Sequence, residues 1–284
     1  MSARLVMAAM LLAWAAPALQ AQVAETVHFP SKGGASRLVA YLYLPATPGP
    51  HPAVVMMHGR AGLYSASSAT HDAQALSSRH VLWARFWADR GYAALLVDSF
   101  GPRGYPRGFA AGTNDGSRPP EVNEVTIRPL DAYGALDYLR KRGGVVADQV
   151  FLHGWSNGGS AALSAASARA PGIVAPTPAT GFRAVLSMYP ACTQVARHYA
   201  GDYATYTPLL LLIGSDDEEV RPENCRILAD DAKDNGSDVE FVLYEGAEHS
   251  YDTPSPGRRR LPANVAAAAD SMRRAQAFFE QYRN

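Results

Sequence analysis

One stretch of the sequence decides the fold: Phe151-Leu152-His153-Gly154-Trp155-Ser156-Asn157-Gly158-Gly159-Ser160. An apolar run ends at a glycine, and a small, alanine-rich segment follows over residues 160–170. This order predicts a buried strand, a sharp turn and a helix. The turn has the Gly-x-Ser-x-Gly pattern of a nucleophile elbow, which holds a serine on a strained backbone. Glycine is required at 154 and 158, because a side chain at either position would collide with the neighbouring strand or helix.

Short apolar runs alternate with helical segments along the rest of the chain. Strands are expected at 25–29, 37–44, 53–57, 92–97, 150–153, 184–188, 209–213 and 239–244, and helices at 72–90, 129–142 and 263–282. This alternation predicts an α/β fold, a doubly wound and mostly parallel sheet of about seven or eight strands with helices on both faces. In such folds the functional site lies at the carboxyl ends of the strands.

No internal repeat or linker divides the chain, so residues 22–284 are expected to form a single domain. Residues 99–127 form a long connection rich in glycine, proline and arginine, without periodicity. Connections of this length inside a domain are usually functional or disordered.

The first 21 residues have the pattern of a secretory signal peptide. Arg4 precedes an apolar run over 5–16, and small residues mark two cleavage sites, after Ala18 and after Ala21. The run is short for a membrane span, although an uncleaved anchor is the alternative. We therefore expect an exported protein, periplasmic or secreted, without membrane attachment after cleavage.

The composition limits the partners that the protein can have. Of its 284 residues, 26 are lysine or arginine and 26 are aspartate or glutamate, so no net positive charge attracts nucleic acid. The two cysteines, Cys192 and Cys225, indicate one disulfide in an exported protein, with two free buried thiols as the alternative. The cysteines are too few for a structural zinc site and the histidines lack ligand spacing, so we expect neither metal nor cofactor. Nothing in the sequence specifies an oligomeric state.

An acid and a base follow Ser156 in the order Ser, Asp, His, each directly after a predicted strand. Asp216 and Asp217 follow the strand at 209–213, and His249 follows the strand at 239–244. These residues should meet Ser156 at one edge of the sheet. A serine hydroxyl needs a base to take its proton and a third group to orient that base. We assign His249 as the base and one of the two aspartates as its partner.

A hydrolase of this kind also needs two backbone N–H groups directed at the developing oxyanion. One is expected from Asn157, next to the serine, and the other from Arg60 in the loop 58–62. We expect His58 to brace that loop by hydrogen bonding.

Three residues near the predicted site are candidate substrate contacts, Tyr64, Arg103 and Trp155. A structural pair with Asp98 is the preferred alternative for Arg103, and packing beside the elbow is preferred for Trp155. Aromatic residues on the loops, Tyr64 among them, would give the pocket a rim suited to an apolar or aromatic group. The neighbouring charges over 218–219 are expected to be solvated.

Five segments resemble the dienelactone hydrolase family of α/β-hydrolases, and the resemblance runs from about residue 37 to 280. The segments are 58–64, 98–104, 154–159, 214–217 and 246–249. In that family the fourth residue of the Gly-x-x-Asp segment is the triad acid, which selects Asp217. Cys192 and Cys225 also resemble a cysteine pair of exported-looking members. The enzyme that names the family uses a cysteine nucleophile, whereas this chain has Ser156, so the resemblance implies a serine esterase relative.

The sequence therefore predicts a serine hydrolase of the α/β-hydrolase fold that cleaves small-molecule carboxylic esters, and lactones among them, through an acyl-enzyme. A peptidase, amidase or acyltransferase on the same triad is the alternative, since the fold hosts all of these. A non-catalytic binding protein of the same fold is the alternative from another class.

Overall fold

The computed structural model describes residues 24–113 and 117–283. The expected signal peptide, residues 1–21, lies outside the described residues. No helix within the described ranges has both the length and the apolar character that a bilayer crossing requires.

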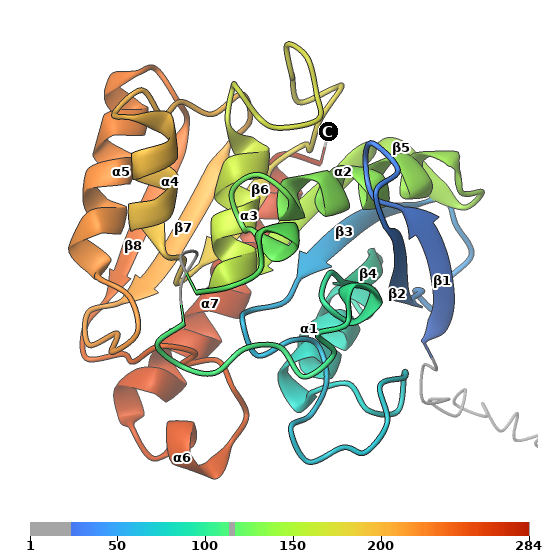
Figure 1. The fold of residues 1–284 in the computed structure, drawn as a ribbon, viewed down its shortest axis with the longest axis horizontal. Coiled ribbons are helices and arrows are strands. Elements are labelled where there is room, and N and C mark those ends of the chain that lie inside the picture. The colour runs from blue at the N-terminus through green and yellow to red at the C-terminus, as the bar shows by residue number, and fades with distance from the viewer. Residues whose placement is uncertain (1–23, 114–116, 284) are drawn as a thin grey trace, which may run out of the picture.

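An eight-stranded sheet forms the centre of the molecule, in the order β1-β2-β4-β3-β5-β6-β7-β8 (Figure 1). The strands are β1 (Glu25–Pro30), β2 (Arg37–Tyr43), β3 (His51–Met57), β4 (Ala93–Asp98), β5 (Val145–Trp155), β6 (Val185–Met188), β7 (Leu209–Gly214) and β8 (Val239–Tyr244). β2 is antiparallel to both of its neighbours, and the pairings from β4 to β8 are parallel. The α/β fold expected from the sequence is therefore confirmed, with β1 and β8 at opposite sides of the molecule in Figure 1.

Helices cover the sheet in two groups. The helices are α1 (Ser78–Ala88), α2 (Arg128–Lys141), α3 (Asn157–Ala166), α4 (Cys192–Tyr199), α5 (Pro222–Asp234), α6 (Pro256–Arg259) and α7 (Pro262–Gln281), with short 3-10 turns η1 (Gly101–Arg103) and η2 (Pro120–Val122). Helices α2 to α5 contact one another in chain order. Helix α1 meets α7 through the stacked rings of Trp87 and Phe279, whose centroids are 4.9 Å apart.

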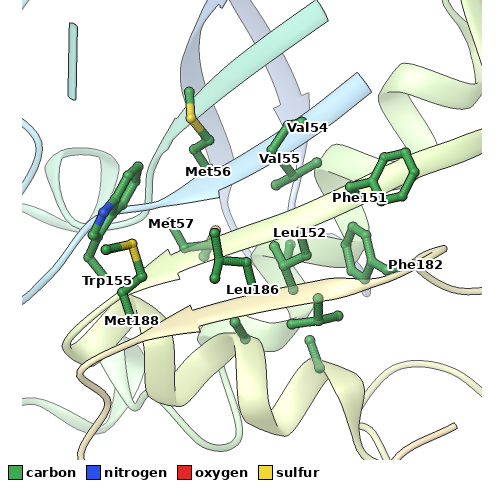
Figure 2. Close-up of a cluster of buried hydrophobic side chains, with 14 of the residues drawn as sticks. Val54, Val55, Met56, Met57, Phe151, Leu152, Trp155, Phe182, Leu186 and Met188 are labelled. Carbon is green, nitrogen blue, oxygen red and sulfur yellow. The ribbon is translucent and has the colours of Figure 1, made fainter. Parts of the chain in front are cut away.

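The central strands carry continuous apolar runs because both faces of the sheet are covered there. All seven residues of β3 are buried. Figure 2 shows their side chains with those of β5 and β6, among them Val55, Leu152 and Leu186. This packing fixes the carboxyl ends of the three strands, and two of them, β3 and β5, lead directly into the site.

The helix in this region is shorter than the predicted range 72–90, so the predicted bounds are wrong. α1 begins at Ser78, because the preceding residues follow another local pattern. The Asp72 carboxylate accepts hydrogen bonds from the backbone N–H groups of Gln74 and Ala75, at 3.0 and 3.2 Å. Such a side-chain turn competes with helix formation. Leu76 then forms a strand-like bridge with Tyr64.

The expected disulfide between Cys192 and Cys225 is present. It joins the first residue of α4 to the first turn of α5. The two helices follow β6 and β7, so the bond holds together two segments at the carboxyl edge of the sheet.

Replacing both cysteines by alanine should lower the melting temperature. The bond closes a loop with a sequence separation of 33 residues, and its loss should cost about 3–4 kcal/mol, or roughly 5–10 °C for a domain of this size. Calorimetry of the oxidised protein and of the double variant measures the difference. The wild type treated with reductant is the control, and an unchanged melting temperature in both would contradict the prediction.

Candidate active site

The predicted nucleophile stands on a strained turn between β5 and α3. Ser156 has φ 51° and ψ −118°, a region that non-glycine residues rarely adopt. A Cβ at Gly154 would lie 2.1 Å from the carbonyl oxygen of Gly158, and a Cβ at Gly158 would lie 2.1 Å from that of Met57. The requirement for glycine on both sides of the serine is therefore confirmed: one position meets α3 and the other meets β3.

The structure brings Ser156, His249 and Asp217 together. His249 Nε2 lies 3.0 Å from the Ser156 hydroxyl oxygen, and His249 Nδ1 lies 2.8 Å from Asp217 Oδ2. Nδ1–H donates to the carboxylate, which leaves Nε2 free to accept the serine proton. The rival carboxylate of Asp216 accepts from the Ser215 hydroxyl and does not reach the imidazole.

Local hydrogen bonds orient both the carboxylate and the imidazole. Asp217 Oδ1 accepts from the backbone N–H groups of Glu219 and Val220, both at 2.9 Å, which directs Oδ2 to the ring. The His249 backbone N–H donates to Glu218 Oε2 at 2.9 Å. The Tyr189 ring meets the imidazole edge to face, with centroids 4.8 Å apart. The loop after β7 therefore holds both members of the pair.

The two expected oxyanion donors flank Ser156. A Cβ at Gly59 would lie 3.3 Å from the Ser156 Cβ, so the loop after β3 runs directly against the serine. As the first residue of α3, Asn157 has no intrahelical acceptor for its N–H. The Arg60 N–H meets no backbone acceptor in the described part of the chain.

His58 braces the loop after β3, as expected from the sequence. Its Nδ1 lies 2.8 Å from the Gly59 carbonyl oxygen, and its Nε2 accepts from the Ser99 backbone N–H at 3.2 Å. Complete burial holds the pKa of His58 well below its ordinary value, so the ring is neutral. The imidazole thus ties the end of β3 to the end of β4.

Arg128 is a supporting residue that the sequence did not reveal. Its fully buried guanidinium donates to the Asn157 side-chain oxygen and to the His58 carbonyl oxygen, the latter at 2.8 Å. Burial lowers its pKa to about 10, although Asp131 and Glu124 counteract the shift. Arg128 therefore remains charged at neutral pH and joins the loop after β3 to the start of α3.

A cavity of about 800 Å³ opens beside Ser156. Its lining is largely polar and charged, with contributions from the connection at 99–127, from α4 and from the loop before α5: Arg60, Thr113, Arg118, Glu124, Thr193, Gln194, Arg197, Glu218, Glu219, Arg221 and Asn224. The sequence predicted an apolar or aromatic rim for the pocket, and this prediction is wrong.

None of the three candidate substrate contacts lines this cavity, so a substrate contact is corrected for each. The structural role preferred for Arg103 and the packing preferred for Trp155 are found instead. Tyr64 is buried and donates to Asp98 Oδ2 at 2.9 Å. Arg103 forms a two-pronged ion pair with Asp131, at 2.7 and 2.8 Å, and not with Asp98. Trp155 is fully buried within the core. Each of these side chains therefore makes its contacts inside the protein.

Glu218 and Glu219 are not simply solvated charges, which corrects a further expectation. Glu218 pairs with Arg258 at 2.5 Å, and Glu219 receives two hydrogen bonds from Arg60, at 2.6 and 2.8 Å. The acidic run after β7 is therefore part of the site.

The fold and the site define an α/β-hydrolase with a serine at its nucleophile elbow. The model of the dienelactone hydrolase family matches residues 38–283, and the chain belongs to this family. It is accordingly a hydrolase that acts on ester bonds. Among curated proteins no relative matches the sequence.

Solved structures of similar fold carry names in accord with this family. A structure from Klebsiella pneumoniae, provisionally named a dienelactone hydrolase, has a TM-score of 0.68 and 19% identity, covering 93% of this chain and 100% of that chain. A dienelactone hydrolase-like promiscuous phosphotriesterase from metagenomic libraries has a TM-score of 0.68 and 21% identity, with the same coverage. Thermogutta terrifontis esterase 2, phosphorylated by paraoxon, has a TM-score of 0.63 and 19% identity, covering 91% of this chain and 94% of that chain.

Replacing Arg128 by methionine should destabilise the protein by about 2–5 kcal/mol, because buried acceptors lose their donor and nearby carboxylates lose their counter-charge. Urea denaturation measures this loss. Arg273→Met is the matched control, since the Arg273 side chain is 74% exposed, and it should change stability by no more than about 0.5 kcal/mol. Equal effects of the two substitutions would refute the role assigned to Arg128.

Proposed function

We propose that this protein is a serine esterase that cleaves carboxylic esters, lactones included, through an acyl-enzyme on Ser156. The hydrogen-bonded chain from the Ser156 hydroxyl through His249 to Asp217, with links of 3.0 and 2.8 Å, carries the proposal. The serine is 8% exposed and lines the cavity, so a bound ester can reach it.

In the proposed mechanism, His249 Nε2 takes the hydroxyl proton as Ser156 Oγ attacks the ester carbonyl carbon. The carbonyl oxygen becomes an oxyanion and accepts hydrogen bonds from the backbone N–H groups of Arg60 and Asn157. Asp217 stabilises the imidazolium without taking its proton. His249 then gives the proton to the departing alcohol oxygen, which leaves an acyl group on the serine.

Water completes the proposed cycle. His249 removes a proton from a water molecule, whose oxygen attacks the acyl carbon. Collapse of the second tetrahedral intermediate breaks the bond to Ser156 Oγ, which recovers its proton from the imidazolium. The carboxylic acid leaves, and the scheme uses only the ester, water and the chain's own residues.

The oriented triad and the unengaged backbone donors argue against a non-catalytic binding protein of the same fold. A peptidase, amidase or acyltransferase on the same residues remains the alternative. The family membership favours ester bonds.

A fluorophosphonate probe should label the wild-type protein, and Ser156→Ala should abolish the labelling. The probe reacts only with an activated serine, so the result depends on the proposed proton transfer to His249. Because the Thermogutta esterase is phosphorylated by paraoxon, paraoxon should add a single diethyl phosphate to this protein in intact-mass analysis. Ser67→Ala, at an exposed loop position, is the control and should label like the wild type. Labelling of Ser156→Ala would sink the proposal.

The polar cavity should favour esters with short acyl chains. A methylene that finds no apolar wall gains none of its about 0.8 kcal/mol of burial energy. A long chain that covers the polar lining also desolvates it at a cost, so kcat/KM for p-nitrophenyl acetate should exceed that for the decanoate. A lactone and a peptide anilide measured in the same assay distinguish the alternative activities. A preference for the decanoate would contradict the assignment of this cavity as the acyl site.

We further propose that the protein is exported after removal of residues 1–21 or 1–18. The leader pattern supports this, and so does the disulfide, since disulfides persist in oxidising compartments. The mature protein should begin at Leu19 or Gln22, which N-terminal sequencing of exported material tests. An intact Met1 on that material would contradict it.

A further inference from the structure

Glu219 contacts the acid, the base and the oxyanion loop together. Its backbone N–H donates to Asp217 Oδ1 at 2.9 Å. Its Oε2 lies 3.8 Å from His249 Nε2, the ring nitrogen that faces the serine. Both of its carboxylate oxygens accept from the Arg60 guanidinium, Oε1 at 2.6 Å and Oε2 at 2.8 Å. One side chain thus connects elements 159 residues apart in sequence.

Arg60 is held on both its backbone and its side chain. Its carbonyl oxygen accepts from the Phe109 N–H at 2.8 Å, and its guanidinium donates back to the Phe109 carbonyl oxygen at 3.2 Å. Its Nε and Nη2 form the fork to Glu219. The residue whose N–H is the proposed oxyanion donor is therefore fixed from the connection at 99–127 and from the loop after β7.

We propose that the Arg60–Glu219 ion pair is a positioning device for the esterase site. It fixes the Arg60 N–H beside Ser156, and it prevents the Glu219 carboxylate from holding His249 in its protonated, inactive form. The inference rests on the proposed function, because both effects concern the proton transfer from Ser156.

The charge argument follows from the distances. An unpaired carboxylate at 3.8 Å from His249 Nε2 would stabilise the imidazolium and compete with Ser156 for that nitrogen. Burial raises the pKa of Glu219, but the hydrogen bonds from Arg60 and the charges of His249 and Arg60 together outweigh it and lower the pKa below its ordinary value. Glu219 is therefore ionised at neutral pH, and its effect on His249 depends on the counter-charge of Arg60.

The other groups around His249 have partners of their own. Asp217 accepts from Nδ1, and Glu218 accepts from the His249 backbone N–H with Arg258 as its counter-ion. The Tyr189 ring packs against the imidazole, and its hydroxyl donates to Asp252. Arg79 donates to the hydroxyls of Tyr189 and Ser250. Arg60 and Glu219 are the charged pair on the side of Nε2.

An ordinary surface ion pair would have neither effect. Exposed pairs contribute little and are screened by salt. Here the Arg60 and Glu219 side chains are only 18% and 24% exposed, and both line the cavity at Ser156. The pair therefore lies where a substrate must pass.

The test is the pH dependence of kcat/KM for p-nitrophenyl acetate in Arg60→Met, Glu219→Gln and the double variant. Arg60→Met leaves a lone carboxylate, so the acid limb should move to higher pH by about half a unit or more. Glu219→Gln leaves a lone guanidinium, so the limb should move to lower pH. In the double variant both charges are gone, so the acid limb of the pH profile should return to the wild-type position. Its kcat should stay low, because the fork between the two side chains is lost as well.

Two further variants separate charge from geometry. Arg60→Lys keeps the charge without the planar fork, so its acid limb should match the wild type while kcat falls. Glu223→Gln breaks the exposed Glu223–Arg226 pair, whose side chains are 61% and 51% exposed, and it should change neither quantity. Acid limbs of Arg60→Met and Glu219→Gln that coincide with the wild type, or that move in the same direction, overturn the proposal.

Failure of the inference is distinguishable from failure of the proposed function. If the esterase proposal fails, the wild type neither hydrolyses the ester nor reacts with the fluorophosphonate probe. If only the inference fails, the wild type does both and the acid limbs do not diverge. Circular dichroism checks that each variant folds. If Arg60→Met does not fold, Glu219→Gln decides the question alone. An acid limb that moves to lower pH in Glu219→Gln supports the proposal, and an unmoved acid limb overturns it.

Discussion

The site depends on one close contact, between Gly158 at the start of α3 and the end of β3. A Cβ at Gly158 would lie 2.1 Å from the Met57 carbonyl oxygen, so the helix can approach the strand only where a side chain is missing. This approach sets Ser156 beside Gly59, next to the two residues whose N–H groups are the proposed oxyanion donors, Arg60 and Asn157. Arg128 then fastens the two segments by donating to both. The placement of the polar groups of the site therefore depends on the absence of a side chain at Gly158.

Much of the fold and the core of the site could be predicted because their signals are local. The apolar runs marked the central strands, and parallel topology carries the ends of β5, β7 and β8 to one edge of the sheet. Ser156 and His249 follow directly from these positions, and family resemblance separated Asp217 from Asp216. The start of α1 was missed because a single hydrogen-bonding aspartate, Asp72, outweighed the apolar pattern.

The roles that the sequence did not reveal, those of Arg128 and Glu219, depend on contacts between distant segments. Arg128 meets His58 across 70 positions, and Arg60 meets Glu219 across 159. No spacing rule connects such pairs, and an arginine before a proline or a glutamate in an acidic run looks like any solvated charge. The same limit applies to the cavity, because Arg197 and Arg221 come from segments whose relative placement is set by tertiary packing. Tyr64 was misjudged for the converse reason, because it lies near the site in sequence but is turned into the protein. For Arg103 the structural role was foreseen and only its partner was wrong.

The covalent link between α4 and α5 has a consequence for how this protein can diverge. Thr193 and Asn224, one from each helix, are joined by a hydrogen bond of 2.7 Å beside the disulfide, and both line the cavity. The reacting groups, by contrast, stand on strand ends and on the elbow. One wall of the cavity is therefore cross-linked within itself, by a disulfide and a hydrogen bond. Its exposed face can accumulate substitutions, and with them new substrate preferences, while the geometry around Ser156 is inherited unchanged.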